Sequence, residues 1–179
     1  MNDEIDILKD VAARLERAGI AYMLTGSLAM SFYAQPRMTR DIDLVVALEG
    51  QDCAALEQAL GSDYYLSDDA VRNAVAREGT FNAIHMGSVV KVDFIVRKRE
   101  AYRRIEFDRR QRAQLGDFPV WIASKEDLIL SKLWWARDSQ SEMQLKDVRN
   151  LLASGCDRAY LDAWAQTLGV TASLRSCGT

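Results

Sequence analysis

Two aspartates stand at the start of an otherwise apolar segment, DIDLVV, in which Asp41 and Asp43 are separated by one isoleucine. Aspartate is depleted in β-strands, and like charges that share one face of a sheet repel each other. Because side chains alternate across a strand, Asp41 and Asp43 would project from the same face. The later segment KVDFIV places Lys91 and Asp93 on one face by the same rule. If the two strands are neighbours, three carboxylates converge on one patch of sheet.

Such a patch of negative charge needs a compensating cation. Mg²⁺ takes hard oxygen ligands and usually works between one or two carboxylates and substrate phosphates. Two such ions about 4 Å apart can hold the attacking and leaving oxygens of an in-line phosphoryl displacement. The pattern therefore predicts a site for two Mg²⁺ ions, with Mn²⁺ as the alternative, at Asp41, Asp43 and Asp93.

A Gly-Ser pair, Gly26 and Ser27, lies upstream of these acids. Glycine lets the backbone come close to a phosphate, and the start of a helix offers unpaired N–H groups to an anion. Serine is also a common helix cap, so the pair gains its meaning from the basic loop and acidic strand that follow. Arg37 and Arg40 frame that loop, and either they contact phosphate or they balance the acids.

Hydrophobic periodicity predicts the scaffold for these residues, an α/β (α+β) fold with a mixed β-sheet flanked by helices. Strands are expected at residues 20–24, 41–48, 80–86, 89–96 and 119–123. Helices are expected at residues 3–18, 27–34, 50–61, 68–77, 125–136, 142–153 and 158–168. We expect a core over residues 1–123 and a C-terminal helical bundle over residues 124–179, packed on the core or continuous with it.

The composition is that of an ordinary globular protein, with 49% hydrophobic and 27% charged residues. A formal net charge of -3 gives no global reason to expect binding to nucleic acid or a membrane. No apolar run is long enough to cross a bilayer, and the acidic, amphipathic start of the sequence leads us to expect no signal peptide. The three cysteines are odd in number and lack metal-like spacing, so we expect reduced thiols in a soluble, cytoplasmic protein.

The order of Gly-Ser, short helix, Asp-x-Asp strand and Lys-x-Asp strand resembles the signature of the polymerase-beta-like nucleotidyltransferase superfamily. The segments TGSLAM, RMTRDIDLVV and FNAIHMGSVVKVDFIV carry this resemblance. The C-terminal segments SKEDLILSKLWWARDSQSEMQLKDVRNLL and YLDAWAQTLGV resemble small bacterial stand-alone nucleotidyltransferases, which are related to AbiEii-like toxins. The resemblance covers nearly the whole chain and implies a nucleotidyltransferase fold.

The resemblance also implies roles for the motif residues. Asp41 and Asp43 would bind both metals or the nucleotide-bearing one. Asp93 would complete the second metal site and help deprotonate the acceptor hydroxyl. Gly26 and Ser27 would hold the triphosphate.

Lys91, Lys132 and Arg40 complete the expected nucleotide site. Lys91 either neutralises phosphate charge, fixes Asp93, or is a surface lysine beside an acid. Related proteins place the helix of Lys132 beside the nucleotide, where a lysine suits phosphate as a point charge. The alternative is an amphipathic helix with solvated lysines, which is the favoured interpretation for Lys125 on the same helix, whereas the apolar neighbours of Lys132 favour function. Asp147 corresponds to a helical acid in the toxin-like group, although an exposed aspartate among basic neighbours needs no special role.

Other residues are expected to be structural. His85 is interpreted as a hydrogen-bonded structural residue and Ser124 as a helix cap. The four tryptophans, Trp121, Trp134, Trp135 and Trp164, are expected to pack in the core rather than stack on bases. The segment 97–112 holds eight basic and three acidic residues. It could steer a polyphosphate or RNA, but solvated surface is the favoured interpretation.

These observations predict an enzyme that moves a nucleoside monophosphate from an NTP, such as ATP, to an acceptor hydroxyl with release of pyrophosphate. The acceptor would be a tRNA end, a protein or a small molecule. The alternative is a non-catalytic or weakly catalytic nucleotide-binding component of a toxin–antitoxin pair, associated with a cognate antitoxin or partner protein. A structural metal site is a third, less favoured interpretation. The NTP, the acceptor and the oligomeric state stay open.

Overall fold

A mixed β-sheet forms the centre of the chain in the computed structural model, which describes residues 3–35, 39, 41–139 and 141–178. The strand order is β3-β4-β5-β2-β1-β7-β6. The strands are β1 (Tyr22–Thr25), β2 (Asp41–Val46), β3 (Tyr64–Leu66), β4 (Thr80–His85), β5 (Lys91–Val96), β6 (Gln111–Leu115) and β7 (Phe118–Ile122). β2 pairs with β5, and β1 with β7, in parallel, and the other pairs are antiparallel.

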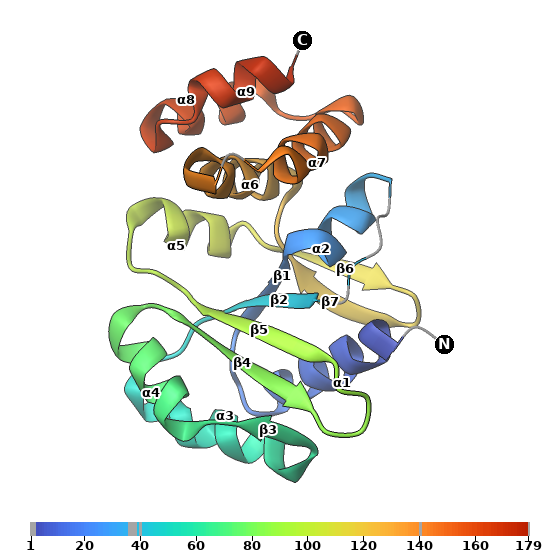
Figure 1. Cartoon of the computed structure of the whole chain (residues 1–179), viewed down its shortest axis with the longest axis vertical. Helices are drawn as coiled ribbons and strands as arrows, with labels where there is room; N and C mark the ends of the chain where they lie inside the picture. Colours follow the sequence, from blue (N-terminus) through green and yellow to red (C-terminus); the bar gives the residue numbers. More distant parts are fainter. Residues whose placement is uncertain (1–2, 36–38, 40, 140, 179) are drawn as a thin grey trace.

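Helices cover both sides of this sheet. They are α1 (Asp3–Arg17), α2 (Gly26–Tyr33), α3 (Cys53–Leu60), α4 (Asp68–Arg77), α5 (Ala101–Asp108), α6 (Lys125–Ser139), α7 (Glu142–Ala153), α8 (Arg158–Leu168) and α9 (Thr171–Cys177). In Figure 1, α6 to α9 form a layer above the sheet, and α3 and α4 lie below it. The expected mixed sheet flanked by helices is therefore confirmed. Within the described part of the chain, every helix is too short or too polar to span a bilayer.

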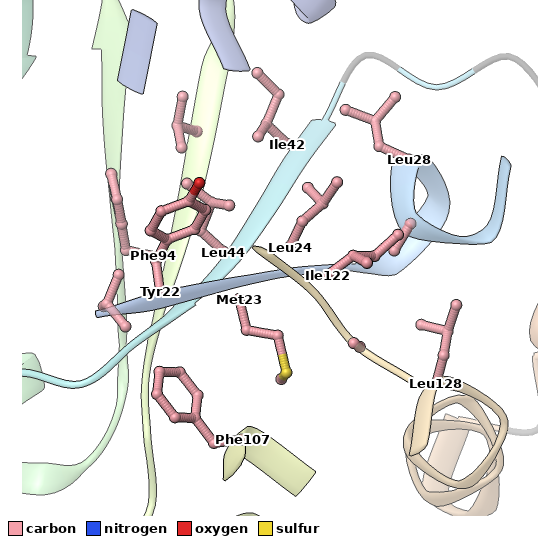
Figure 2. Packing of buried hydrophobic residues seen from close by; sticks show 14 of the residues in the cluster. Tyr22, Met23, Leu24, Leu28, Ile42, Leu44, Phe94, Phe107, Ile122 and Leu128 are labelled. Atoms are coloured by element: carbon pink, nitrogen blue, oxygen red, sulfur yellow. The ribbon is translucent and has the colours of Figure 1, made fainter. Parts of the chain in front are cut away.

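The core follows from the alternation of side chains along the strands. On β2, Ile42, Leu44 and Val46 are fully buried, whereas Asp41 and Asp43 occupy the opposite face. Figure 2 shows Ile42 and Leu44 gathered on one side of the sheet, with Met23 of β1 pointing to the other. The apolar residues of β2 thus pack in the core on one face of the sheet, and the acids lie on the opposite face, toward α6.

Several short elements were not expected from the sequence. They are β3, β6, α5 and α9, together with a 3₁₀ turn at Gly61–Asp63, whereas the 3₁₀ turn at Gly50–Asp52 forms the start of the helix expected at residues 50–61. α5 lies in the strongly charged segment and buries chiefly Tyr102, Glu106 and Phe107, so its apolar periodicity is weak. β3 has three residues and β6 buries one side chain, Ala113. Tertiary packing, more than local pattern, stabilises these elements.

A buried aspartate ties the helical layer to the rest of the chain. Asp127 of α6 has no exposed surface. Its carboxylate accepts hydrogen bonds from Ser124 Oγ at 2.5 Å, Tyr160 OH at 2.7 Å, Arg109 Nε at 3.0 Å and Tyr102 OH at 3.2 Å. Ser124 Oγ also accepts from the Asp127 backbone N–H at 3.2 Å, so the expected helix cap is present. One carboxylate therefore joins α5, α6 and α8.

Candidate active site

The acids of β2 and β5 lie in register. The parallel pairing sets Asp41 opposite Lys91 and Asp43 opposite Asp93. Since matched positions of paired strands share a face, the side chains of all four residues project toward one side of the sheet. Asp93 thus lies on the strand next to Asp41 and Asp43 and on the same face of the sheet, as its expected role requires. The catalytic and metal-binding roles themselves stay predictions.

Lys91 lies between two of the acids. Its Nζ is 2.8 Å from Asp93 Oδ2 and 3.8 Å from Asp41 Oδ1. The hydrogen bond with Asp93 is the main cause that raises the pKa of Lys91, so this ammonium stays charged. The geometry therefore matches the expectation that Lys91 fixes Asp93, and the same ammonium lies near Asp41.

Asp43 is the acid whose charge is least compensated. The pKa of Asp43 is raised from 3.8 to about 6, chiefly by burial and then by the charges of Asp93 and Asp41. Lys132 and Lys91 oppose this effect without cancelling it. Protonation or an added cation would relieve the repulsion at this position.

The donor set of the three aspartates fits a divalent cation. Carboxylate oxygens are hard ligands of the kind that Mg²⁺ prefers, and they come from facing positions of two paired strands. Within the described ranges, no group of three acidic, cysteine or histidine side chains is placed to hold a metal ion on its own, so the aspartates would supply only part of the ligands. A site of this kind takes its remaining ligands from water and substrate phosphates.

Gly26 is required by the position of Asp43. Thr25, the last residue of β1, pairs with Asp43, and Gly26 then takes a left-handed backbone conformation with φ of +67°. A Cβ at Gly26 would lie 2.7 Å from Asp43 Cγ and still closer to Oδ2. Ser27 follows in the first turn of α2 and is buried. The absence of a side chain at Gly26 thus leaves room for the Asp43 carboxylate, and it would also let a phosphate come close.

Lys132 forms a buried ion pair with Asp147, joining α6 to α7. Lys132 Nζ is 2.8 Å from Asp147 Oδ2 and donates to Gln144 Oε1 at 3.1 Å. Asp147 is only 2% exposed, so the expectation of a solvated aspartate is wrong. Its spacing from Leu151, one helical turn later, was the sequence signal for an inward position. Lys132 is likewise buried, at 4% exposed.

A cavity of about 460 Å³ is lined by some of these residues, including Gly26, but its lining does not include Asp41, Lys91 or Ser27. Asp43 and Asp93 line it from the sheet, and Lys132, Trp134 and Trp135 line it from α6. Trp135 is 52% exposed, so the expectation that it packs in the core is wrong. Although it lies next to Leu133 and Trp134 on α6, Trp135 lines the cavity instead of packing in the core.

The basic segment 97–112 is divided between internal contacts and this cavity. Arg103 pairs with Glu106 at 2.8 Å, and Arg109 pairs with Asp127 at 3.0 Å. Arg97 and Lys98 line the cavity, as does Arg103. Only part of the segment is therefore the solvated surface that was expected.

The remaining residues singled out in the sequence lie elsewhere. His85 Nδ1 is 2.9 Å from Ser88 Oγ, and its ring packs on Tyr64, in keeping with a structural role. Lys125 Nζ donates to the carbonyls of Ser154 and Gly155 rather than to solvent alone. Arg37 and Arg40 lie outside the described residues, so their contact with phosphate stays a prediction.

Family comparison identifies the chain. Residues 10–169 match the family model described as nucleotidyl transferase AbiEii toxin, type IV toxin–antitoxin system. The chain belongs to this family. This AbiEii-family chain is thus a nucleotidyltransferase, and its family is one of toxins in type IV toxin–antitoxin systems. A search of curated proteins returned no match.

Solved structures share the fold of this AbiEii-family chain at low sequence identity. ANT(2")-Ia, determined with adenylyl-2"-tobramycin, has 16% identity and a TM-score of 0.56, over 97% of this chain and 98% of its own. A nucleotidyltransferase-like antigen of Paracoccidioides brasiliensis has 18% identity and a TM-score of 0.57, over 98% and 92%. The lincosamide adenylyltransferase LnuA, bound to lincomycin, has 15% identity and a TM-score of 0.55, over 84% and 96%.

Proposed function

We propose that this AbiEii-family chain transfers a nucleoside monophosphate from an NTP to an acceptor hydroxyl and releases pyrophosphate, with Mg²⁺, or alternatively Mn²⁺, as cofactor. The observation that carries the proposal is the facing of Asp43 and Asp93 across β2 and β5, in one cavity with Gly26 and Lys132. The acceptor is the hydroxyl of a tRNA end, a protein or a small molecule. As a family member, the chain would act together with a cognate antitoxin or partner protein.

The triphosphate would lie between Gly26 and α6. The first N–H groups of α2, with Ser27, can donate to phosphate oxygens. Asp147 and Gln144 hold Lys132 where it lines the cavity, so its ammonium can meet a phosphate without first being ordered. Arg40 would add a further contact.

The three aspartates would divide the chemistry. Asp41 and Asp43 would hold the metal, which supplies charge stabilisation for the transferring phosphate and the leaving pyrophosphate. Asp93, whose carboxylate pairs with Lys91 Nζ at 2.8 Å, would take the proton of the acceptor hydroxyl. The acceptor oxygen then bonds to the α-phosphorus, the bond to the bridging oxygen breaks, and that oxygen leaves with pyrophosphate.

Transfer of label from an α-labelled NTP to acceptors in a cell extract tests this proposal. We expect Asp43→Asn and Asp93→Asn to lower the rate at least about 100-fold, because each removes a charge from the reacting centre. Asp162→Asn, an exposed position on α8, is the matched control. Wild-type rates in both site variants would contradict the assignment. Binding of Mg²⁺-ATP without transfer to any acceptor would favour the non-catalytic toxin–antitoxin component instead.

A further inference from the structure

A second cavity, of about 510 Å³, lies in the helical layer and shares no lining residue with the cavity of the aspartates. It is lined by α7, by the connection from α7 to α8, and by the ends of α8 and α9 that face this connection. Figure 1 shows α8 and α9 beyond α6, on the side away from the sheet. We call this the thiol cavity, because two of the three cysteines of the chain, Cys156 and Cys177, line it together with Arg149 and Arg158.

The two free thiols of this cavity differ in exposure. Cys177, at the end of α9, is only 6% exposed, and its Sγ lies 3.8 Å from the carbonyl oxygen of Leu145 on α7. Cys156, in the connection between α7 and α8, is partly exposed. Because thiol–disulfide exchange requires access to the attacking sulfur, Cys156 is the thiol that a disulfide in the cavity can meet.

Hydrogen bonds on both sides of Cys156 fix its position. The carbonyl of Gly155 accepts from Lys125 Nζ at 2.6 Å, and the Asp157 backbone N–H donates to Glu126 Oε1 at 3.0 Å. Both partners lie in the first turn of α6. The backbone at Cys156 is therefore held against α6, and its thiol is presented to the cavity from a fixed support.

The charge around Cys156 is positive. Among the described residues, the lining of the thiol cavity includes Arg149 and Arg158 and no carboxylate. Arg149 has only a loose pair with Glu142, at 3.9 Å, and the Glu142 side chain is 83% exposed. The cavity also adjoins the start of α8, where the helix dipole favours negative charge. Arginine binds carboxylates through paired N–H donors, so the cavity suits a ligand that carries carboxylates.

We propose that Cys156 is a modification site that forms a mixed disulfide with an acidic low-molecular-weight thiol, whose carboxylates bind Arg149 and Arg158. The co-reactant is the disulfide of that thiol. The Cys156 thiolate attacks one of its sulfurs, a new S–S bond forms to Cys156, and the S–S bond of the co-reactant breaks. The other half leaves as a thiolate and takes up the proton that Cys156 gave up. Cys156 is thus oxidised and the leaving half is reduced.

Incubation of the folded protein with glutathione disulfide, followed by peptide mass spectrometry, tests the proposal. We expect one glutathione on each chain, attached to Cys156 and removed by dithiothreitol, and none in Cys156→Ser. Cys53 is the internal control, since it is 2% exposed and lines another cavity that includes the carboxylate of Glu49. We expect Cys53 to react only in urea. An adduct mainly on Cys53 or Cys177 of the folded protein, an internal disulfide between Cys156 and Cys177, or no adduct at all would overturn the proposal.

A comparison with cystamine, a disulfide that carries amines in place of carboxylates, tests the role of the arginines. We expect the ratio of the glutathione disulfide rate to the cystamine rate at Cys156 to be at least about 10-fold higher in the folded protein than in urea, and to fall with added salt. Arg158→Glu should abolish this preference, whereas Lys146→Glu, an exposed position of α7 outside the cavity, should retain it. The same ratio in folded and unfolded wild type would overturn the proposal, whether or not Arg158→Glu folds.

Discussion

At the scale of single residues, Asp43 shows the conflict between folding and chemistry most directly. Its burial and the two neighbouring carboxylates raise its pKa to about 6. Asp43 must be ionised to bind a metal. Near neutral pH, which is above this pKa, the folded protein carries the Asp43 carboxylate charge although burial and the two neighbouring acids disfavour it. The charge on Asp43 therefore lowers the free energy of unfolding of the metal-free protein, and a bound cation raises it again.

The pH dependence of stability tests this view of Asp43. Because the pKa is higher in the folded than in the unfolded chain, the folded state retains a proton between about pH 4 and 6, and stability falls as pH rises through this window. We expect Asp43→Asn to stabilise the metal-free protein at pH 7.5 by up to about 3 kcal/mol and to have little effect at pH 4. Urea unfolding of both proteins across this range, with chelator, measures the difference. A stability difference between the two proteins that does not change with pH would contradict the raised pKa of Asp43.

Gly26 offers a second prediction, with an internal control. Gly26→Ala forces a side chain into a left-handed conformation and against the Asp43 carboxylate, whereas Gly19→Ala, at φ of +70°, meets nothing within 4 Å. We expect both to lose about 1–2 kcal/mol of stability from backbone strain. Only Gly26→Ala should also lose nucleotidyl transfer, by at least about 100-fold, because it displaces an acid. Urea unfolding and label transfer separate the two effects, and equal activity in both variants would contradict a close fit of Asp43 on Gly26.

At the scale of elements, the pairing of α6 with α7 carries the buried ion pair of Lys132 and Asp147. Asp147→Ala leaves an ammonium buried without its main partner, so we expect a loss of about 3–5 kcal/mol. Lys146→Ala, the exposed neighbour on the same helix, should change stability by less than about 0.5 kcal/mol. Urea unfolding measures both, and similar values would show that the pair contributes little.

The elements also show what could be predicted from the sequence. The acidic strands were predictable because alternation over six residues marks both the buried face and the face of Asp41 and Asp43. That β2 and β5 are neighbours had to be assumed, because the local pattern of a strand does not determine which strand it pairs with. The buried state of Asp147 was not predicted, because its spacing from Leu151 marks an inward position but does not reveal Lys132 as its partner on the facing helix. The exposure of Trp135 was not predicted because it depends on what faces α6.

At the scale of the whole molecule, the site is shared by two parts of the chain. The sheet supplies the acids, and α6 supplies Lys132 and the tryptophans. We propose that residues 1–123 and 124–179 fold as one unit, since Asp127 binds Tyr102 and Arg109 across the boundary. A fragment of residues 1–123 should therefore lack fixed tertiary structure, because it exposes the core residues that contact α6. Near-ultraviolet circular dichroism measures this, and a native-like aromatic spectrum would contradict it.

Removal of divalent ions should leave the fold intact. Lys91 already compensates Asp93 and part of the charge of Asp41, so chelated protein is expected to retain its near-ultraviolet spectrum and lose only the added stability that a bound ion supplies. Lys91→Met, which removes this compensation, should make stability depend more strongly on Mg²⁺. Thermal unfolding with and without the ion measures this, and identical ion dependence in both proteins would argue against the role of Lys91.

The ammonium of Lys91 would therefore separate folding of the protein from its activation. A newly synthesised chain would reach its native state with a built-in counter-ion, whatever the supply of free magnesium at that moment. The protein would become able to transfer a nucleotide only when an NTP binds together with its metal ions and Lys91 moves partly away from the aspartates. For a toxin, this order of events would make nucleotide availability, and not protein synthesis, the point at which harm to the cell begins.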